Sequence, residues 1–92
     1  MIRHIVLWKF RAGEEERVQR FLDGLRNLQG TVPELLHSEV AVSIGGNYDA
    51  SLVAEFASME ALEIYKNDPC HVEVSALCRA IRTDRASVDY EF

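Results

Sequence analysis

Two side chains that could do chemistry lie six residues apart in the sequence, the phenol of Tyr65 and the imidazole of His71. Between them runs Asn67-Asp68-Pro69. The residue before a proline disfavours helical backbone, so this stretch is expected to end one helix. Asp68 can cap a following helix and Pro69 suits its first position, so the same stretch is expected to begin the next one. The pair is therefore predicted to flank a corner between two helices.

The residue types in this pair fit proton abstraction next to a carbonyl group. With Pro69 as the first helical residue, His71 lies in the first turn, where the positive end of the helix dipole disfavours imidazolium. We therefore predict a neutral His71 at pH 7 that acts as a general base. Tyr65 could donate a hydrogen bond to a carbonyl or a developing enolate. Such a pair fits aldol-type cyclisation, isomerisation or lyase chemistry, and it needs no metal or cofactor.

A purely structural role explains the same residues. Tyr65 continues the apolar stripe of Met59 and Leu62, so it could pack with its hydroxyl bonded to backbone. His71 could form a hydrogen bond across the corner and hold the two helices together. The sequence leaves the catalytic and the structural interpretations open.

Composition limits the class of protein. The 92 residues suffice for one domain, residues 1–92, and 48% of them are hydrophobic, as in globular proteins. The net charge of 10 − 15 = −5 repels phosphate backbones, so we expect no nucleic-acid partner. No apolar run approaches the ~20 residues that cross a membrane. Two cysteines without disulfide or metal spacing, and an N-terminus without a signal-peptide pattern, predict a cytoplasmic protein.

The elements that must position the pair follow from alternation and helical spacing. We expect strands over residues 2–10, 35–44, 48–56 and 85–92, with a turn at Thr83-Asp84 before the last. Helices are expected over 14–29, over 59–66, and from Pro69 through the stripe that ends at Ile81. The order is the split β-α-β-β-α-β pattern of an α+β, ferredoxin-like fold. It predicts a four-stranded antiparallel sheet with the first and third strands central and the helices on one face.

The first strand indicates how the protein assembles. Its two faces are both apolar in the middle, and a strand of this kind is covered on both sides. The helices of this chain can cover only one face of the sheet. We therefore expect a homodimer in which two sheets pack face to face. The two faces of this strand are Ile2, His4, Val6, Trp8 and Phe10 on one side and Arg3, Ile5, Leu7 and Lys9 on the other.

A family resemblance extends over the whole chain. It is carried by Arg3-His4-Ile5-Val6-Leu7-Trp8-Lys9-Phe10, Tyr48-Asp49, Phe56-Ala57-Ser58 with Glu60-Ala61-Leu62, Tyr65 with Pro69-x-His71, and Val88-Asp89-Tyr90. These motifs, in this order and spacing, resemble the stress-responsive A/B barrel (Dabb) family. The resemblance implies a ferredoxin-like monomer and a homodimer whose two sheets form an α+β barrel.

The resemblance also suggests roles for individual residues. A plant polyketide cyclase of this family uses a tyrosine and a histidine in the same tyrosine–proline–histidine arrangement, which by position are Tyr65 and His71. A histidine of its first strand lines the pocket, and His4 matches it. The other apolar residues of that pocket are not matched. We therefore take Tyr65 and His71 as candidate catalytic residues and His4 and Trp8 as candidate ligand-binding residues.

Other interpretations of these residues come from their positions alone. His4, on an apolar strand face, could be a hydrogen-bonded core residue, and Trp8 could pack in the core or at the dimer interface. His37 is expected to be exposed. A zinc site formed by His4, Cys70 and His71 has no support from the spacing of other residues. No metal or cofactor is therefore expected.

Three classes of function remain open. The first is a homodimeric Dabb-type protein that binds a small apolar or carbonyl-containing molecule. The second is a cofactor-free cyclase, isomerase or lyase that uses the Tyr65–His71 pair. The third is a cofactor-free monooxygenase, which no distinctive residue supports.

Overall fold

The computed structural model describes all 92 residues of the chain. Its elements follow one another as β1 (Ile2–Phe10), α1 (Glu15–Leu28), β2 (His37–Val42), β3 (Ala50–Phe56), α2 (Met59–Asn67), α3 (Pro69–Ile81) and β4 (Arg82–Glu91). This is the expected ferredoxin-like order, with the second helical segment divided into α2 and α3.

The strands form one antiparallel sheet in the order β2-β3-β1-β4. The prediction that β1 and β3 are central and that β2 and β4 are edges is therefore confirmed. Because β1 pairs with β3 on one side and with β4 on the other, His4 lies between Ala54 and Asp89. The ends of the chain also meet, since the N–H of Phe92 donates to the carbonyl of Met1 at 3.0 Å.

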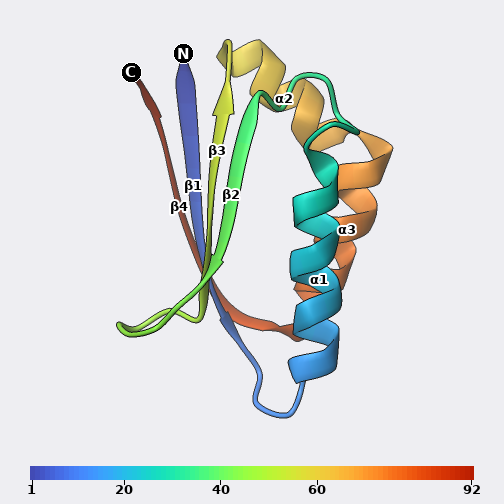
Figure 1. Cartoon of the computed structure of the whole chain (residues 1–92), viewed down its shortest axis with the longest axis vertical. Coiled ribbons are helices and arrows are strands. Elements are labelled where there is room, and N and C mark those ends of the chain that lie inside the picture. Colours follow the sequence, from blue (N-terminus) through green and yellow to red (C-terminus); the bar gives the residue numbers. More distant parts are fainter.

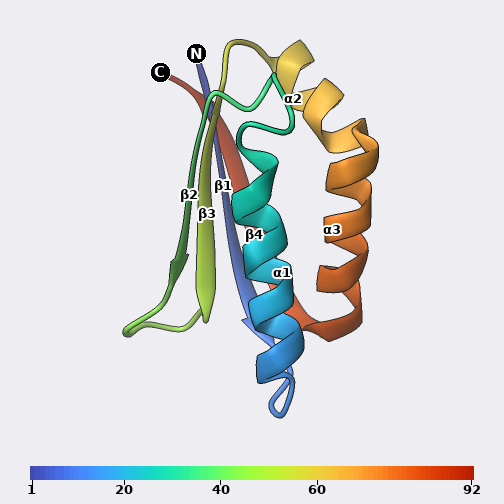
Figure 2. The ribbon, with the colours of Figure 1, turned by 45° about the vertical axis from the view of Figure 1, so that its right-hand side comes forward.

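All three helices lie on the same side of the sheet, and its opposite face has no helix over it (Figure 1). The view turned by 45° shows α1 and α3 side by side, with α1 in front of β4 and α3 to the right of the sheet, and α2 above α3 (Figure 2). The molecule thus has two layers. No helix is long and apolar enough to cross a membrane.

The core fills the space between these layers. The small residues of β3 lie beside large residues of β1, with Ala50 opposite Trp8 and Ala54 opposite His4. The room that these alanines leave is therefore used by bulky neighbours. Trp8 also meets Phe21 of α1 edge-on, at 5.1 Å between ring centroids. The buried stripe of α1 consists of Phe21, Leu22, Leu25 and Leu28.

The edge strand β2 is shorter than expected. It ends at Val42 rather than Ile44 and begins at His37 rather than Leu35. Leu36 is 51% exposed, whereas Leu35 is buried. The residues before His37 form a turn and not an extended strand, so strand alternation does not apply to them.

The turn expected at Thr83-Asp84 is absent. β4 begins at Arg82, directly after α3, and Asp84 is already paired with Lys9. The register between β1 and β4 shifts between Lys9 and Phe10. This irregularity lets the chain enter the strand without a separate turn. The other ends differ slightly: β3 begins at 50 rather than 48, β4 ends at 91 rather than 92, α1 spans 15–28, and α2 ends at 67.

The face of the sheet that carries no helix is apolar. On β4, Val88 points to this face and is 54% exposed, while Asp89 points toward the helices. Arg3 crosses the same face, where it pairs with Glu55 at 2.9 Å and lies 3.9 Å from the centre of the Phe92 ring. The apolar residues that the alternation places on this face are Ile5, Leu7, Ala41, Val53, Ala86, Val88 and Tyr90.

Gly24 allows α1 and α3 to approach closely, because a Cβ atom there would lie 3.1 Å from Cγ2 of Val74. We expect Gly24→Val to lower the free energy of unfolding by about 1–3 kcal/mol, since the added atoms force the helices apart. Chemical denaturation at a fixed protein concentration measures this change. Arg20→Val, at an exposed position of the same helix, is the control and carries only a propensity cost of about 0.5 kcal/mol. Equal losses in the two variants would contradict a close helix contact.

Candidate functional site

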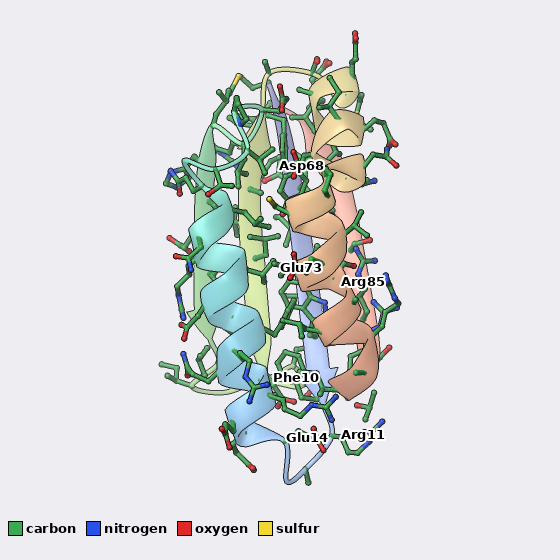
Figure 3. All side chains as sticks on the ribbon, turned by 90° about the vertical axis from the view of Figure 1, so that its right-hand side faces the viewer. Phe10, Arg11, Glu14, Asp68, Glu73 and Arg85 are labelled. Carbon is green, nitrogen blue, oxygen red and sulfur yellow. The ribbon has the colours of Figure 1, made fainter.

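The corner between α2 and α3 has the geometry predicted from the sequence. Asp68 has extended backbone (φ −62°, ψ 133°), and its Oδ1 accepts a hydrogen bond from the N–H of Cys70 at 2.8 Å. Pro69 is the first residue of α3, which places His71 in the first turn. Figure 3 shows Asp68 at the junction of the two helices. The corner is thus fixed by a cap at the start of α3 and by Ser58 at the start of α2, whose hydroxyl accepts from the N–H of Ala61 at 3.1 Å.

A small cavity lies between this corner, α1, α3 and the inner face of the sheet. Its volume is about 60 Å³. Both candidate catalytic residues and both candidate ligand-binding residues line it, so the fold brings all four together. The lining residues are His4, Val6, Trp8, Phe21, Leu25, Leu52, Tyr65, His71, Ser75, Cys78, Arg82 and Arg85.

Tyr65 is buried, with 1% of its surface exposed. Its ring packs between Phe56 and His71, with centroid distances of 5.0 and 4.4 Å. Burial raises the pKa of Tyr65 to about 12, so the phenol is neutral at physiological pH. The hydroxyl has no hydrogen-bond partner within the chain, so the backbone bond expected for a purely structural tyrosine is absent. This leaves it as a donor beside the cavity.

His71 combines a structural contact with a free nitrogen. Its Nδ1 lies 3.1 Å from the carbonyl oxygen of Lys66, so it carries the proton and donates across the corner. This is the helix-joining bond of the structural interpretation. Nε2 then holds a lone pair. Burial lowers the pKa of His71, which agrees with the neutral imidazole that we predicted. The main cause is burial and not the helix dipole that we invoked.

His4 forms the second polar pair of the cavity. Its ring is 5% exposed, and Nδ1 forms a short hydrogen bond with Oδ1 of Asp89. Burial lowers the pKa of His4, while the bond to Asp89 acts in the opposite direction. His4 thus is a hydrogen-bonded core histidine, as its position in the strand suggested. It also lines the cavity, as the candidate ligand-binding role requires.

The sequence could have revealed this partnership. Asp89 alternates with the apolar residues of β4, and a strand order that places β4 beside β1 brings it opposite His4. We did not combine register with alternation, so Asp89 was missed. Arg82 and Arg85 were also missed. Arg82 lies at the unexpected start of β4, and Arg85 alternates with the apolar residues of this strand, so the same combination of register and alternation places it opposite Trp8.

The remaining candidates have simple positions. Trp8 is buried in the core on the helix side of the sheet and not on its open face, which rules out the interface position considered for it. His37 is exposed, as predicted. Cys70 is exposed and Cys78 buried, and both are free thiols. No cluster of three or more His, Cys, Asp or Glu side chains could hold a metal ion.

Comparison with known families identifies the chain. Residues 2–92 match the family model of the stress responsive A/B barrel domain, Dabb. The chain belongs to the Dabb family. This confirms the resemblance drawn from the motifs, over nearly the full length of the chain. No curated protein sequence matches the chain.

Solved structures share the Dabb fold. A dimeric ferredoxin-like protein of unknown function from Bacteroides fragilis is 28% identical, with a TM-score of 0.87 over 99% of this chain and 95% of that one. A dimeric ferredoxin-like protein from Thermobifida fusca is 26% identical, with a TM-score of 0.89 over 99% and 90%. A hydroxynitrile lyase from Passiflora edulis has a TM-score of 0.86 over 97% and 90% but only 15% identity, which shows the fold alone.

Acidification is expected to destabilise this Dabb domain. Burial lowers the pKa of His4 and of His71 in the folded state relative to 6.5, so below about pH 6.5 the unfolded chain binds more protons. The free energy of unfolding should therefore fall as the pH drops from 6.5 through the lowered pKa values. Urea denaturation between about pH 7.5 and 5 measures it.

A histidine replacement tests the cause of this pH dependence. His71→Gln removes one of the two buried imidazoles and should reduce the slope of stability against pH below 6.5. His37→Gln, at an exposed position of β2, is the matched control. A slope in His71→Gln equal to that of the unmodified chain would show that His71 is not responsible.

Proposed function

We propose that this Dabb domain binds a small carbonyl-containing molecule in the cavity lined by Tyr65 and His71. The observation that carries the proposal is the Tyr65 hydroxyl, which is neutral, forms no hydrogen bond within the chain and lies on the same cavity as His71. Its proton is therefore free for a bound molecule. A ligand carbonyl oxygen would accept this hydrogen bond.

The same arrangement supports removal of a proton from the carbon next to the bound carbonyl. His71 Nε2 would accept the proton as the C–H bond breaks and an N–H bond forms. The electron pair moves to the carbonyl oxygen, where the hydrogen bond from Tyr65 stabilises the enolate. The bond from Nδ1 to the Lys66 carbonyl fixes the tautomer that this step needs and stabilises the imidazolium that results.

Two functions are compatible with this site, binding alone and cofactor-free cyclase, isomerase or lyase chemistry. The small volume of the cavity favours a compact ligand or the reactive end of a longer one. The Passiflora edulis hydroxynitrile lyase shares the fold, which adds the lyase class to the candidates without suggesting a substrate. The apolar packing on Trp8 and Leu52 favours a ligand that also has an apolar part.

We further propose that the chain forms a homodimer through the open face of its sheet. The solved structures from Bacteroides fragilis and Thermobifida fusca are described as dimeric. On this chain, the apolar side of β4 and the middle of β1 share the face that no helix covers, with Val88 beside Ile5. A second copy of the sheet would cover these side chains.

Carbon-acid exchange tests the proposed chemistry. Acetoacetamide in D₂O exchanges its methylene protons, and one-dimensional NMR follows their loss. We expect the protein to accelerate this exchange and His71→Gln to reduce the enzymatic part by about 100-fold, because a positioned general base contributes on that order. Tyr65→Phe should reduce it by about tenfold or more through the lost hydrogen bond.

Tyr48→Phe is the matched control for Tyr65→Phe, since the Tyr48 hydroxyl bonds Asp84 at 3.0 Å and does not line the cavity. If exchange is accelerated equally by Tyr65→Phe, His71→Gln and Tyr48→Phe, the pair has no catalytic part. If Tyr65→Phe and His71→Gln also bind acetoacetamide as tightly as the unmodified chain does, neither side chain binds the carbonyl compound, and the binding proposal is wrong as well.

A charge on the open face tests the dimer. Val88→Glu places a carboxylate where a partner sheet would bury it, so we expect a monomer by sedimentation equilibrium at micromolar concentration. Val72→Glu is the control, because Val72 is similarly exposed (48% against 54% for Val88) but lies on α3. A Val88→Glu protein that stays dimeric would exclude this face as the interface.

A further inference from the structure

Two arginines line the cavity together with Tyr65 and His71. Arg82 is half-buried at the start of β4, and Arg85 is exposed, so the cavity reaches the surface where Arg85 stands. Figure 3 shows Arg85 on β4 beside α3, at the edge of the sheet. A ligand that enters from this side meets the guanidinium groups before the phenol and the imidazole.

Neither guanidinium has a carboxylate partner. Five arginine and lysine side chains form an ion pair with a carboxylate within 4.0 Å, and none of them lines the cavity: Arg3, Arg17, Arg20, Arg26 and Lys66. The one lining residue that contacts a carboxylate is His4. The acidic neighbour in sequence, Asp84, accepts instead from the Tyr48 hydroxyl at 3.0 Å and from the backbone N–H of Arg85 at 2.8 Å. Five of the ten lysine and arginine residues of the chain form no such ion pair, and Arg82 and Arg85 are the two of these five that line the cavity.

The charges of the cavity are arranged along β4. Asp89, bonded to His4, lies four residues beyond Arg85 on the same face of the strand, a distance of roughly 13 Å along the backbone. The carboxylate of Asp89 therefore lies behind His4, which lines the cavity, without lining the cavity itself, whereas Arg82 and Arg85 are part of its lining. An anionic group of a ligand would be repelled from the Asp89 end and attracted to Arg82 and Arg85.

We propose that the ligand is a carbonyl compound that also carries a carboxylate, which Arg82 and Arg85 bind while the carbonyl lies at Tyr65. The guanidinium group matches a carboxylate with two parallel N–H···O bonds, and the charge strengthens both. The carboxylate would orient the ligand, so that only one of its ends reaches His71. This inference rests on the carbonyl-binding function proposed above and adds the charge of the substrate.

An isosteric pair of ligands tests this without any mutation. Acetoacetate and acetoacetamide have the same shape and the same ketone, and only the first is an anion. Trp8 is the only tryptophan of the chain and lines the cavity, so its fluorescence reports binding of both. We expect acetoacetate to bind about tenfold more tightly, or more, at low salt. The preference should shrink as the ionic strength rises.

Variants assign the preference to the two arginines. The double variant Arg82→Gln/Arg85→Gln should bind acetoacetate no better than acetoacetamide. Arg17→Gln/Arg20→Gln removes the same charge from α1, away from the cavity, and should keep the preference. Circular dichroism spectra equal to that of the unmodified chain show that the fold of both double variants is intact.

The outcomes separate the two proposals. Equal or weaker binding of acetoacetate than of acetoacetamide by the unmodified chain would overturn the carboxylate inference but leave carbonyl binding standing. Loss of the preference in both double variants alike would overturn the assignment to Arg82 and Arg85. Inorganic phosphate that displaces acetoacetate at equal concentration would show a general anion site instead. If neither ligand changes the Trp8 fluorescence or the NMR signals of Tyr65 and His71, the carbonyl-binding function itself is wrong.

Discussion

The alternation of β1 is the constraint on which the other features depend. As a central strand, β1 must present one face to the helices and the other to whatever covers the open side of the sheet. The inner face carries two large polar-tipped groups, His4 and Trp8, in a row with the small Ala54 and Ala50 of β3. This match of large and small residues favours one register between β1 and β3. It also places the rings of His4 and Trp8 in the lining of the cavity. A shift of one residue would expose all of them.

The same alternation explains why β4 is polar on its inner side. An edge strand that served only the core would turn Val88 toward the helices. Here the apolar side faces outward, and the inner side supplies Asp89 to His4 and Arg85 to the mouth of the cavity. The helix-facing side of β4 therefore contributes polar side chains to this region in place of apolar side chains to the core. That arrangement makes sense if the inner side is a site and the outer side is an interface.

The fold could be predicted from the sequence almost completely, and the site only in part. Periodicity identified every strand and helix, and the Asp68-Pro69 corner was predicted down to the capping bond, because these features depend on local chemistry. The end of β4 next to α3 could not be predicted, since the bulge opposite Phe10 is a property of the pairing and not of β4 alone.

The site illustrates the same limit in its polar contacts. Tyr65 and His71 are close in sequence, so a helix break was enough to bring them together, whereas Arg85 reaches the cavity, and Asp89 reaches His4, only through the register of the sheet. The lowered pKa of His71 was also not predictable from its own helix, because its main cause is burial, which depends on the packing of the whole chain.

The corner does not force a choice between a structural and a chemical role. His71 uses Nδ1 to hold the Lys66 carbonyl, and that bond is what makes Nε2 a defined acceptor. Tyr65 packs on Phe56, and that packing is what holds its hydroxyl beside the cavity without a partner. Each residue is thus anchored on one side, Tyr65 by the packing of its ring and His71 by a hydrogen bond, and each has a polar atom that no group of the chain binds. The contacts that stabilise the corner are therefore the same contacts that would orient these two atoms toward a ligand, so the structural and the chemical roles do not exclude each other.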